Sequence, residues 1–189
     1  KYEKSFIIDK NTTISAVAIR DGKILTDIEQ KELFVHKALG KATFLKNKPY
    51  HSYTANGGST LVDMEYGGRT WASGKWIGVL NKDLEVEIDL EKEEKVSKVI
   101  LSCINDNAAG IYFPQGIEVL VSNDGKLYDS VLTWERDLNE KQTINSSSMR
   151  RKFTLEFDPI TCKYVKLKAH CLKLEDKGVF IFADEVIVL

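Results

Sequence analysis

The sequence predicts an all-β fold, an antiparallel β-sandwich preceded by a shorter β segment. Short stretches of alternating apolar and polar side chains recur along the chain, and turn residues separate them. Alternation with a period of two is typical of strands that bury one face. The clearest stretches are Leu84–Leu90, Ile117–Ser122, Tyr164–Lys168 and Phe182–Val188. No stretch has a convincing helical period.

Residues 1–38 are expected to form a unit of their own. The pattern predicts three short strands, at residues 5–8, 13–20 and 29–36, with a hairpin turn at Asp21-Gly22. Three strands with a single apolar face are a poor core by themselves. We therefore expect the C-terminal strands of a truncated Ig-like or fibronectin-III-like domain, in a chain that is a fragment of something longer.

Residues 39–189 are expected to form the main sandwich, because their strand patterns follow at the spacing of an all-β domain with long connecting loops. Asp124-Gly125 predicts a tight hairpin after the Ile117–Ser122 strand. The charge run Glu91–Lys95 is interpreted as a solvated turn between two strands. Function is expected in the loops.

Charge and hydropathy exclude several classes of partner. The chain of 189 residues carries 27 basic and 28 acidic side chains, with a formal net charge of -1. Such a balance produces no overall field that would attract nucleic acid or anionic lipid. No apolar run approaches the roughly 20 residues that span a bilayer. We therefore expect no nucleic-acid partner and no membrane insertion.

The three cysteines, Cys103, Cys162 and Cys171, show no metal-ligand spacing. Free cysteine behaves as a small apolar side chain. We interpret all three as packing residues and expect no disulfide framework.

Motifs for catalysis are missing from the sequence. The histidines at positions 36, 51 and 170 form no HExxH pairing, and neither a GxSxG elbow nor a glycine-rich phosphate loop occurs. Paired carboxylates could run glycoside hydrolysis, but a chain with 28 acidic residues always contains some suitable pair. We assign no catalytic residue, while hydrolase activity of the chain itself stays open as an alternative.

The segment Leu61–Gly78 combines groups that bind ligands. It holds a carboxylate, a glycine pair, a hydroxyl and two tryptophans just before the Leu84 strand. Hard oxygen ligands in a tight loop are what calcium requires. Flat aromatic faces flanked by polar side chains are suited to the C–H patches and hydroxyls of sugars.

These features resemble one family. Residues 39–189 resemble the discoidin-type (coagulation factor 5/8 C-terminal) galactose-binding-like domains, and especially the carbohydrate-binding modules at the C-termini of bacterial chitobiases and β-hexosaminidases. Residues 12–18 and 34–38 resemble the last strands of the small sandwich that often precedes such a module. The matching pieces in the main unit are Leu61–Asp63, Trp76–Gly78, Leu84–Leu90, Phe113-Pro114, Val121–Gly125, Lys163–Lys168 and Phe180–Val186.

The resemblance implies a jelly-roll sandwich with a structural Ca²⁺ near one end. It places Asp63 and Glu185 as the carboxylate ligands, which requires the first long loop to meet the last strand. The hydroxyl of Thr70 and backbone carbonyls near Leu61 and Ala183 would complete the oxygen set.

Two departures from the family pattern bear on these sites. Met64 stands where the family has a glycine after the aspartate, and the loop is lengthened by residues 65–68. The segment Leu172–Gly178 is short and charged, where hexosaminidase modules carry an aromatic-rich and histidine-rich loop.

The resemblance also implies a ligand rim made by loop aromatics and polar residues at one end of the sandwich. Core packing is the competing interpretation for each aromatic side chain. The candidates by position are His51, Tyr53, Trp71, Trp76, Asn105, Tyr112 and Phe180.

The resulting hypothesis is a non-catalytic accessory module at the C-terminus of a glycoside hydrolase, a chitobiase or β-hexosaminidase. It would bind glycans that end in galactose or N-acetylhexosamine, with the upstream catalytic domain in the same chain as its partner. Localisation in the periplasm, at the cell surface or outside the cell follows from the resemblance. The alternative is a structural spacer or interaction domain of the same enzyme that binds no sugar.

Overall fold

The chain is described by a computed structural model that covers residues 2–137, 148–175 and 177–189. It divides into two compact units, Lys1–His36 and Lys37–Leu189. The expected boundary lay two residues later. In the described ranges the only helical segments are short 3₁₀ turns, and no helix is long and apolar enough to cross a membrane.

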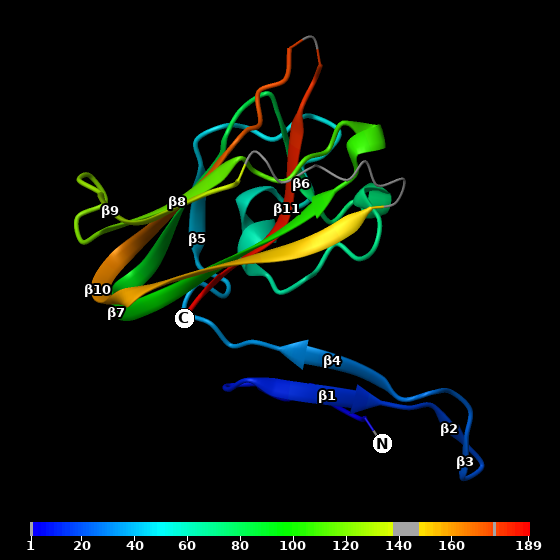
Figure 1. Cartoon of the computed structure of the whole chain (residues 1–189). Coiled ribbons are helices and arrows are strands. Elements are labelled where there is room, and N and C mark those ends of the chain that lie inside the picture. Colours follow the sequence, from blue (N-terminus) through cyan, green and yellow to red (C-terminus); the bar gives the residue numbers. More distant parts are fainter. Residues whose placement is uncertain (1, 138–147, 176) are drawn as a thin grey trace. The chain divides into compact units, whose positions relative to one another are not determined.

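The first unit consists of two small antiparallel pairs. Strand β1 (Thr12–Ala16) pairs with β4 (Glu29–Leu33), and β2 (Ile19–Arg20) pairs with β3 (Lys23–Ile24) (Figure 1). The predicted turn at Asp21-Gly22 is confirmed, with φ values of 50° and 74°. Such positive values at both central residues are typical of the two-residue hairpin turn.

Two strand predictions in this unit need correction. Residues 5–8 form no strand, and the stretch predicted at 13–20 is interrupted at residues 17 and 18. Alternation alone predicted both, but a strand also needs a hydrogen-bonding neighbour. The predicted strand at 29–36 is present as β4 and ends three residues early.

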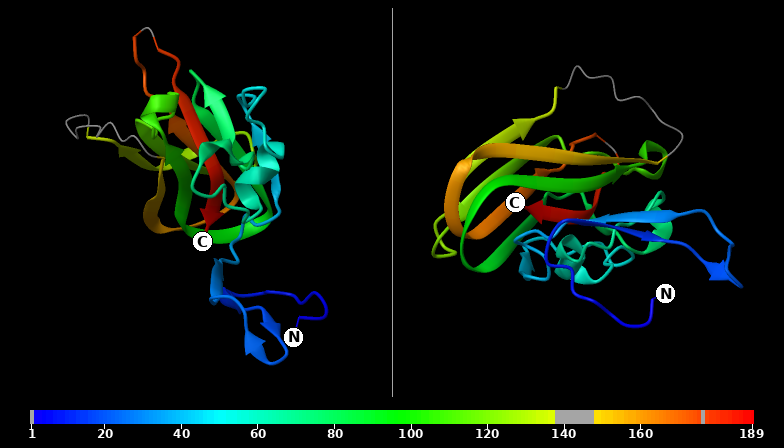
Figure 2. Two further views of the ribbon diagram at one scale, coloured as in Figure 1. Left: turned by 90° about the vertical axis from the view of Figure 1, so that its right-hand side faces the viewer. Right: turned by 90° about the horizontal axis from the view of Figure 1, so that it is seen from below.

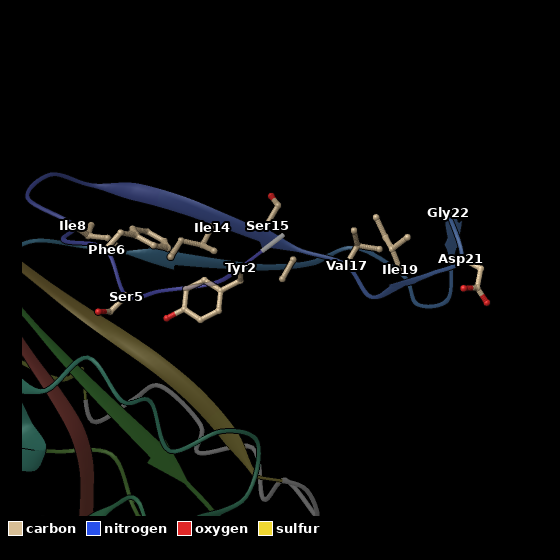
Figure 3. Close-up of a pocket in the computed structure, with 11 residues that line it drawn as sticks. Tyr2, Ser5, Phe6, Ile8, Ile14, Ser15, Val17, Ile19, Asp21 and Gly22 are labelled. Carbon is tan, nitrogen blue, oxygen red and sulfur yellow. The ribbon is translucent and has the colours of Figure 1, made fainter.

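The first unit leaves most of its apolar side chains in solvent. Figure 3 shows Phe6, on the segment before β1, lying beside Ile14 of β1, and both line a cavity of about 1070 Å³. The residues of this cavity all lie between positions 2 and 22. The large apolar side chains of this unit that are exposed are Tyr2, Phe6, Ile7, Val17, Ile19, Ile24, Leu25 and Ile28.

The second unit confirms the predicted antiparallel β-sandwich. Its strands follow the hydrogen-bonded order β6–β11–β7–β10–β8–β9, and β5 pairs with the free side of part of β7. The strands are β5 (Ala42–Leu45), β6 (Ile77–Leu80), β7 (Leu84–Asn105), β8 (Gly116–Ser122), β9 (Asp129–Glu135), β10 (Met149–His170) and β11 (Phe180–Val188). The 3₁₀ turns are η1 (Gly57–Val62), η2 (Trp71–Ser73) and η3 (Asn107–Ala109).

Two long strands, β7 and β10, belong to both layers of the sandwich. The second half of β7 pairs with β11 and with the start of β10, whereas its first half pairs with β5 and with the end of β10. The two ribbons bend together at one end (Figures 1 and 2). Register shifts interrupt the β7–β10 ladder between residues 156 and 160 and between 162 and 164, and Glu91 adopts φ 69°. Bulges of this kind increase bending.

The main core fills the space between the two layers. Val86 and Ile88 on the first half of β7 and Leu101 on its second half belong to one buried cluster. This distribution follows from strand alternation, because every second side chain of a strand points to the same face. The charge run Glu91–Lys95 lies at the bend of β7, within a continuous strand and not in a separate turn.

The cysteines are packing residues, as predicted. Cys103, Cys162 and Cys171 are buried and free. Burial raises the pKa of Cys162 and of Cys171 to about 11, so both stay protonated at neutral pH.

Candidate functional site

A second apolar cluster lies apart from the main core. It consists of the buried residues Trp76, Ile104, Ile111 and Phe182, against which Tyr53, Trp71 and Phe180 pack while only partly buried. Ile104 and Phe182 are paired neighbours on β7 and β11. The loops on either side of η1 and η2 therefore bring their aromatic side chains onto one layer of the sandwich.

Ring contacts join the partly exposed members of this cluster. The Tyr53 ring lies 6.0 Å from that of Trp71, 5.5 Å from that of Phe180 and 4.8 Å from that of Phe182, measured between centroids. Most of these pairs are edge-to-face, the arrangement that aromatic quadrupoles prefer. Tyr53, Trp71 and Phe180 are named here the aromatic rim.

Glycine at position 78 makes this packing possible. An added Cβ on Gly78 would lie 2.9 Å from the Phe182 ring and from Cβ of Tyr53. Its amide also donates to the Tyr53 carbonyl, and its carbonyl accepts from the Tyr50 amide. Strand β6 thus fixes the loop that carries Tyr53.

A polar edge adjoins the aromatic rim. The Tyr50 ring lies 5.4 Å from the Phe180 ring and 4.2 Å from the imidazole of His51. His51 is exposed, and its Nδ1 lies 2.9 Å from the hydroxyl of Ser52. Exposed hydrogen-bonding groups therefore lie beside partly exposed aromatic faces, as sugar recognition requires.

Trp76 occupies a different position from the one a sugar platform needs. Its side chain is 1% exposed, and its Nε1 donates to the carbonyls of Gly67, at 3.2 Å, and Thr70, at 3.0 Å. The indole is thus enclosed, and its only donor is occupied. Trp76 is therefore a core-packing residue, which was the competing interpretation for each aromatic candidate.

Asn105 and Tyr112 also lie outside the rim. Asn105 is buried, and its amide donates to the side chain of Asn107 over 2.8 Å. Tyr112 packs against the main core, although its backbone amide donates to the Phe180 carbonyl. Of the seven predicted ligand residues, the structure brings Tyr53, Trp71 and Phe180 together at the surface, with His51 close by.

The predicted meeting of the first long loop with the last strand is present. The Met64 amide donates to Oε2 of Glu185 over 2.6 Å. Met64 adopts φ 61°, a left-handed conformation that glycine adopts without cost. The methionine thus occupies a backbone conformation that glycine adopts more easily.

The carboxylates of the expected calcium site are withdrawn from solvent to different degrees. Glu185 is 0% exposed, and Asp63, which directly precedes Met64, has a raised pKa because burial disfavours its charge. A bound cation would offset that penalty. The Thr70 hydroxyl accepts a hydrogen bond from the Ala72 amide, and the Thr70 carbonyl accepts one from Nε1 of Trp76, so each oxygen keeps one lone pair. Leu61 and Ala183 are both buried.

Sequence reasoning missed a second buried carboxylate, that of Asp184. Its Oδ2 accepts from the Gly67 amide at 2.7 Å and lies 3.4 Å from Nη2 of Arg150. The Arg150 guanidinium lies over the rings of Tyr66, at 5.1 Å, and Trp76, at 5.7 Å. Burial raises the pKa of Asp184 above its ordinary value, although hydrogen bonds and Arg150 oppose the rise. The sequence signal that could have revealed this buried acid is the pair of consecutive acids, Asp184 and Glu185, in an otherwise apolar terminal strand.

Within the described ranges no group of three or more histidine, cysteine or acidic side chains is arranged to hold a metal ion. One histidine is close to an acid: Nδ1 of His170 lies 3.2 Å from Oδ2 of Asp83. The neighbouring Cys171 amide donates to Oδ1 of the same aspartate. Because the Cys171 thiol is buried with a raised pKa, this trio lacks an activated nucleophile.

Comparisons with known proteins identify a family and its fold. The model of the F5/8 type C domain family matches residues 47–172. Chitosan-binding module 1 from a chitosanase/glucanase of Paenibacillus sp. IK-5 superposes with a TM-score of 0.54 at 14% identity, over 82% of this chain and 98% of the module. No curated protein matches the chain.

Two further solved structures have the same fold. A fucose binding module of Streptococcus pneumoniae gives a TM-score of 0.52 at 17% identity, over 91% of this chain and 99% of that module. CpGH89CBM32-5 of Clostridium perfringens, solved with GalNAc-β-1,3-galactose, gives 0.50 at 15% identity, over 78% and 94%. At these identities the likeness establishes the sandwich fold.

Proposed function

This chain belongs to the F5/8 type C domain family, and on that premise we propose that its second unit is a non-catalytic carbohydrate-binding module. The aromatic rim carries the proposal. Tyr53, Trp71 and Phe180 hold partly exposed faces at fixed angles, with the exposed His51 and Ser52 beside them. The solved modules with this fold include proteins that bind chitosan, fucose and GalNAc-β-1,3-galactose.

The ligand class is a neutral sugar at the end of a glycan, such as galactose or an N-acetylhexosamine. Ring C–H groups would lie on the Trp71 and Tyr53 faces, while His51 and Ser52 exchange hydrogen bonds with hydroxyls. A weak site is sufficient for this function, because the benefit arises from raising the local concentration of a linked domain on a glycan surface.

Isothermal titration of the chain with galactose, N-acetylglucosamine and N-acetylgalactosamine tests the proposal. Binding of at least one of them in the millimolar range or tighter is expected. Silence with all three at millimolar concentrations would favour the alternative, a structural spacer or interaction domain without sugar binding. Turnover of a chromogenic hexosaminide that is lost on replacing one acid would instead show a hydrolase.

We propose a structural calcium ion beneath the loop that follows η1. The carboxylates of Asp63 and Glu185 and the hydroxyl of Thr70 would hold it, together with backbone carbonyls near Leu61 and Ala183. Calcium would supply positive charge that offsets the burial of these two carboxylates. Its role is to fix the loop that ends in η2, which carries Trp71.

We also propose a larger protein around this module. The exposed apolar face of Lys1–His36 is consistent with the closing strands of a fibronectin-III-like domain, since an apolar strand face is stable only when another layer covers it. The upstream partner would be the catalytic domain of a chitobiase or β-hexosaminidase in the periplasm, at the cell surface or outside the cell. Activity of the longer protein on hexosaminides, with sugar binding retained by this chain, is the test.

A further inference from the structure

The outer face of the other layer carries a groove of about 240 Å³. Three strands contribute to it: β5, the first half of β7 and the end of β10. The residues that line it are Phe44, Lys46, Glu85, Glu87 and Lys166. Phe44 is 67% exposed, although it lies within a regular strand, so a large apolar ring faces solvent beside four charged groups.

Strand register fixes the arrangement of this groove. Phe44 pairs with Glu87 across β5 and β7, and Glu87 pairs with Lys166 across β7 and β10. Paired residues in a sheet project from the same face, so the phenyl ring, the carboxylate and the ammonium lie in one row. Oε2 of Glu87 and Nζ of Lys166 are 3.4 Å apart.

A second row runs parallel to the first. Nζ of Lys46 lies 3.4 Å from Oε2 of Glu85, and the Lys46 amide donates to the Glu85 carbonyl. The Glu85 side chain is only 10% exposed, whereas that of Lys46 is 65% exposed. The acid is thus held in place by the sheet, and the lysine covers it from the solvent side.

The ammonium of Lys166 is also held from its other side. It lies 3.6 Å from the centroid of the Tyr128 ring. Burial and the neighbouring Glu87 raise the pKa of Tyr128, so the phenol stays neutral and the ring remains a cation–π partner.

These charges select the class of ligand. The groove holds two carboxylates and two ammonium groups, so any charged ligand meets one repulsive group for each attractive one. A neutral molecule with many hydroxyls uses both kinds, because carboxylates accept and ammonium groups donate hydrogen bonds. The exposed phenyl ring adds a flat apolar face, which matches the C–H face of a sugar ring.

We propose that this groove is a second subsite for a neutral sugar, separate from the aromatic rim. Phe44 stacks against the ring face, Glu85 and Glu87 accept hydroxyl hydrogen bonds, and Lys46 and Lys166 donate them. The choice of a sugar as ligand rests on the proposed function, whereas the site itself rests on the groove. Two weak sites would bind a multivalent glycan more tightly than either alone where its sugar ends reach both sites at once.

Backbone amide resonances of the whole ¹⁵N-labelled chain, followed during titration with methyl β-galactoside or N-acetylglucosamine, test the proposal. We expect shifts at the amides around Phe44, Glu87 and Lys166, in addition to shifts around Trp71. The Phe44→Ala variant should lose the first set, weakening binding there at least tenfold, and keep the second. Because Phe44 is exposed, this variant should melt like the wild type.

Leu127→Ala serves as the control, since Leu127 is also an exposed large apolar residue, at 81% against 67% for Phe44, and lies on the β8–β9 hairpin. It should keep both sets of shifts. Glucuronate and glucosamine should shift the groove amides less than their neutral counterparts. Shifts confined to the aromatic rim would overturn the second subsite and leave the proposed function standing. Shifts at the groove that survive Phe44→Ala would overturn the stacking role, and no shift at either site would overturn both proposals.

Discussion

The carbonyl of Gly67 accepts a hydrogen bond from Nε1 of Trp76 over 3.2 Å, and the same glycine lies flat against the indole. A Cβ at position 67 would overlap the indole ring. The Gly67 amide meanwhile donates to the buried carboxylate of Asp184. One glycine therefore ties the loop that leads to Trp71 both to the second apolar cluster and to β11.

Gly67→Ala is predicted to destabilise the second unit by about 1 to 3 kcal/mol, because overpacking forces the indole or the loop to move. Denaturant unfolding measures the loss. Gly68→Ala is the neighbouring control, since a Cβ there meets nothing within 4 Å and only its φ of 82° opposes a side chain. An unchanged free energy of unfolding for Gly67→Ala would show that the indole contact is unimportant.

Trp71→Ala is predicted to weaken sugar binding at least tenfold while lowering the free energy of unfolding by only about 1 to 2 kcal/mol. Trp71 is partly exposed and makes edge contacts with Tyr53 and Phe182, each worth about 0.5 to 1.5 kcal/mol. Trp76→Ala is the comparison, with an expected cost of about 3 to 5 kcal/mol because that ring is fully buried. Equal costs for the two variants would place Trp71 in the core.

Removal of calcium with a chelator is predicted to lower the melting temperature, because a ligand that binds only the folded state stabilises it by mass action. The Asp63→Asn variant should melt at the lower temperature with or without calcium. Asp158→Asn, at an exposed position on β10, should respond like the wild type. An identical melt of the wild-type chain in calcium and in chelator would end the calcium proposal.

Because of Asp184, the free energy of unfolding is predicted to fall as the pH rises from 3.8, the ordinary pKa of an aspartate, towards neutrality. Its pKa in the folded state is raised, so over that interval the folded chain binds more protons than the unfolded chain, and folding is favoured at the acidic end. Asp184→Asn keeps an acceptor for the Gly67 amide and should flatten this part of the profile.

Urea unfolding at several pH values between about 4 and 7 measures the effect of Asp184. Glu175→Gln, which removes an exposed acid, should leave the profile unchanged. A slope that Asp184→Asn does not alter would mean that Arg150 and the loop amides compensate the buried charge completely.

Much of the sandwich could be predicted from alternation, because a strand that buries one face has apolar side chains at every second position. Residues 84–90, 117–122, 164–168 and 182–188 are strands as expected. The continuity of β7 could not be predicted: the charges of Glu91–Lys95 are typical of a turn, but here they lie on the solvated outside of a bend whose backbone pairing continues.

The candidate site was less predictable, since it depends on contacts between distant loops. The meeting of the first long loop with the last strand followed from family resemblance and could not have come from spacing, although the contact that forms is made by the Met64 amide. Asp184 was missed because alternation directs one of two consecutive residues outward. A register shift between Ala183 and Glu185 changes that alternation, and both acids are fully buried.

A glycan array probed with the whole chain and with the Trp71→Ala variant tests directly whether the aromatic rim binds sugar. We predict that the wild-type chain binds glycans ending in galactose or N-acetylhexosamine and that the variant loses these signals. Wild-type signals at background across the array, or the same signals from both proteins, would contradict it.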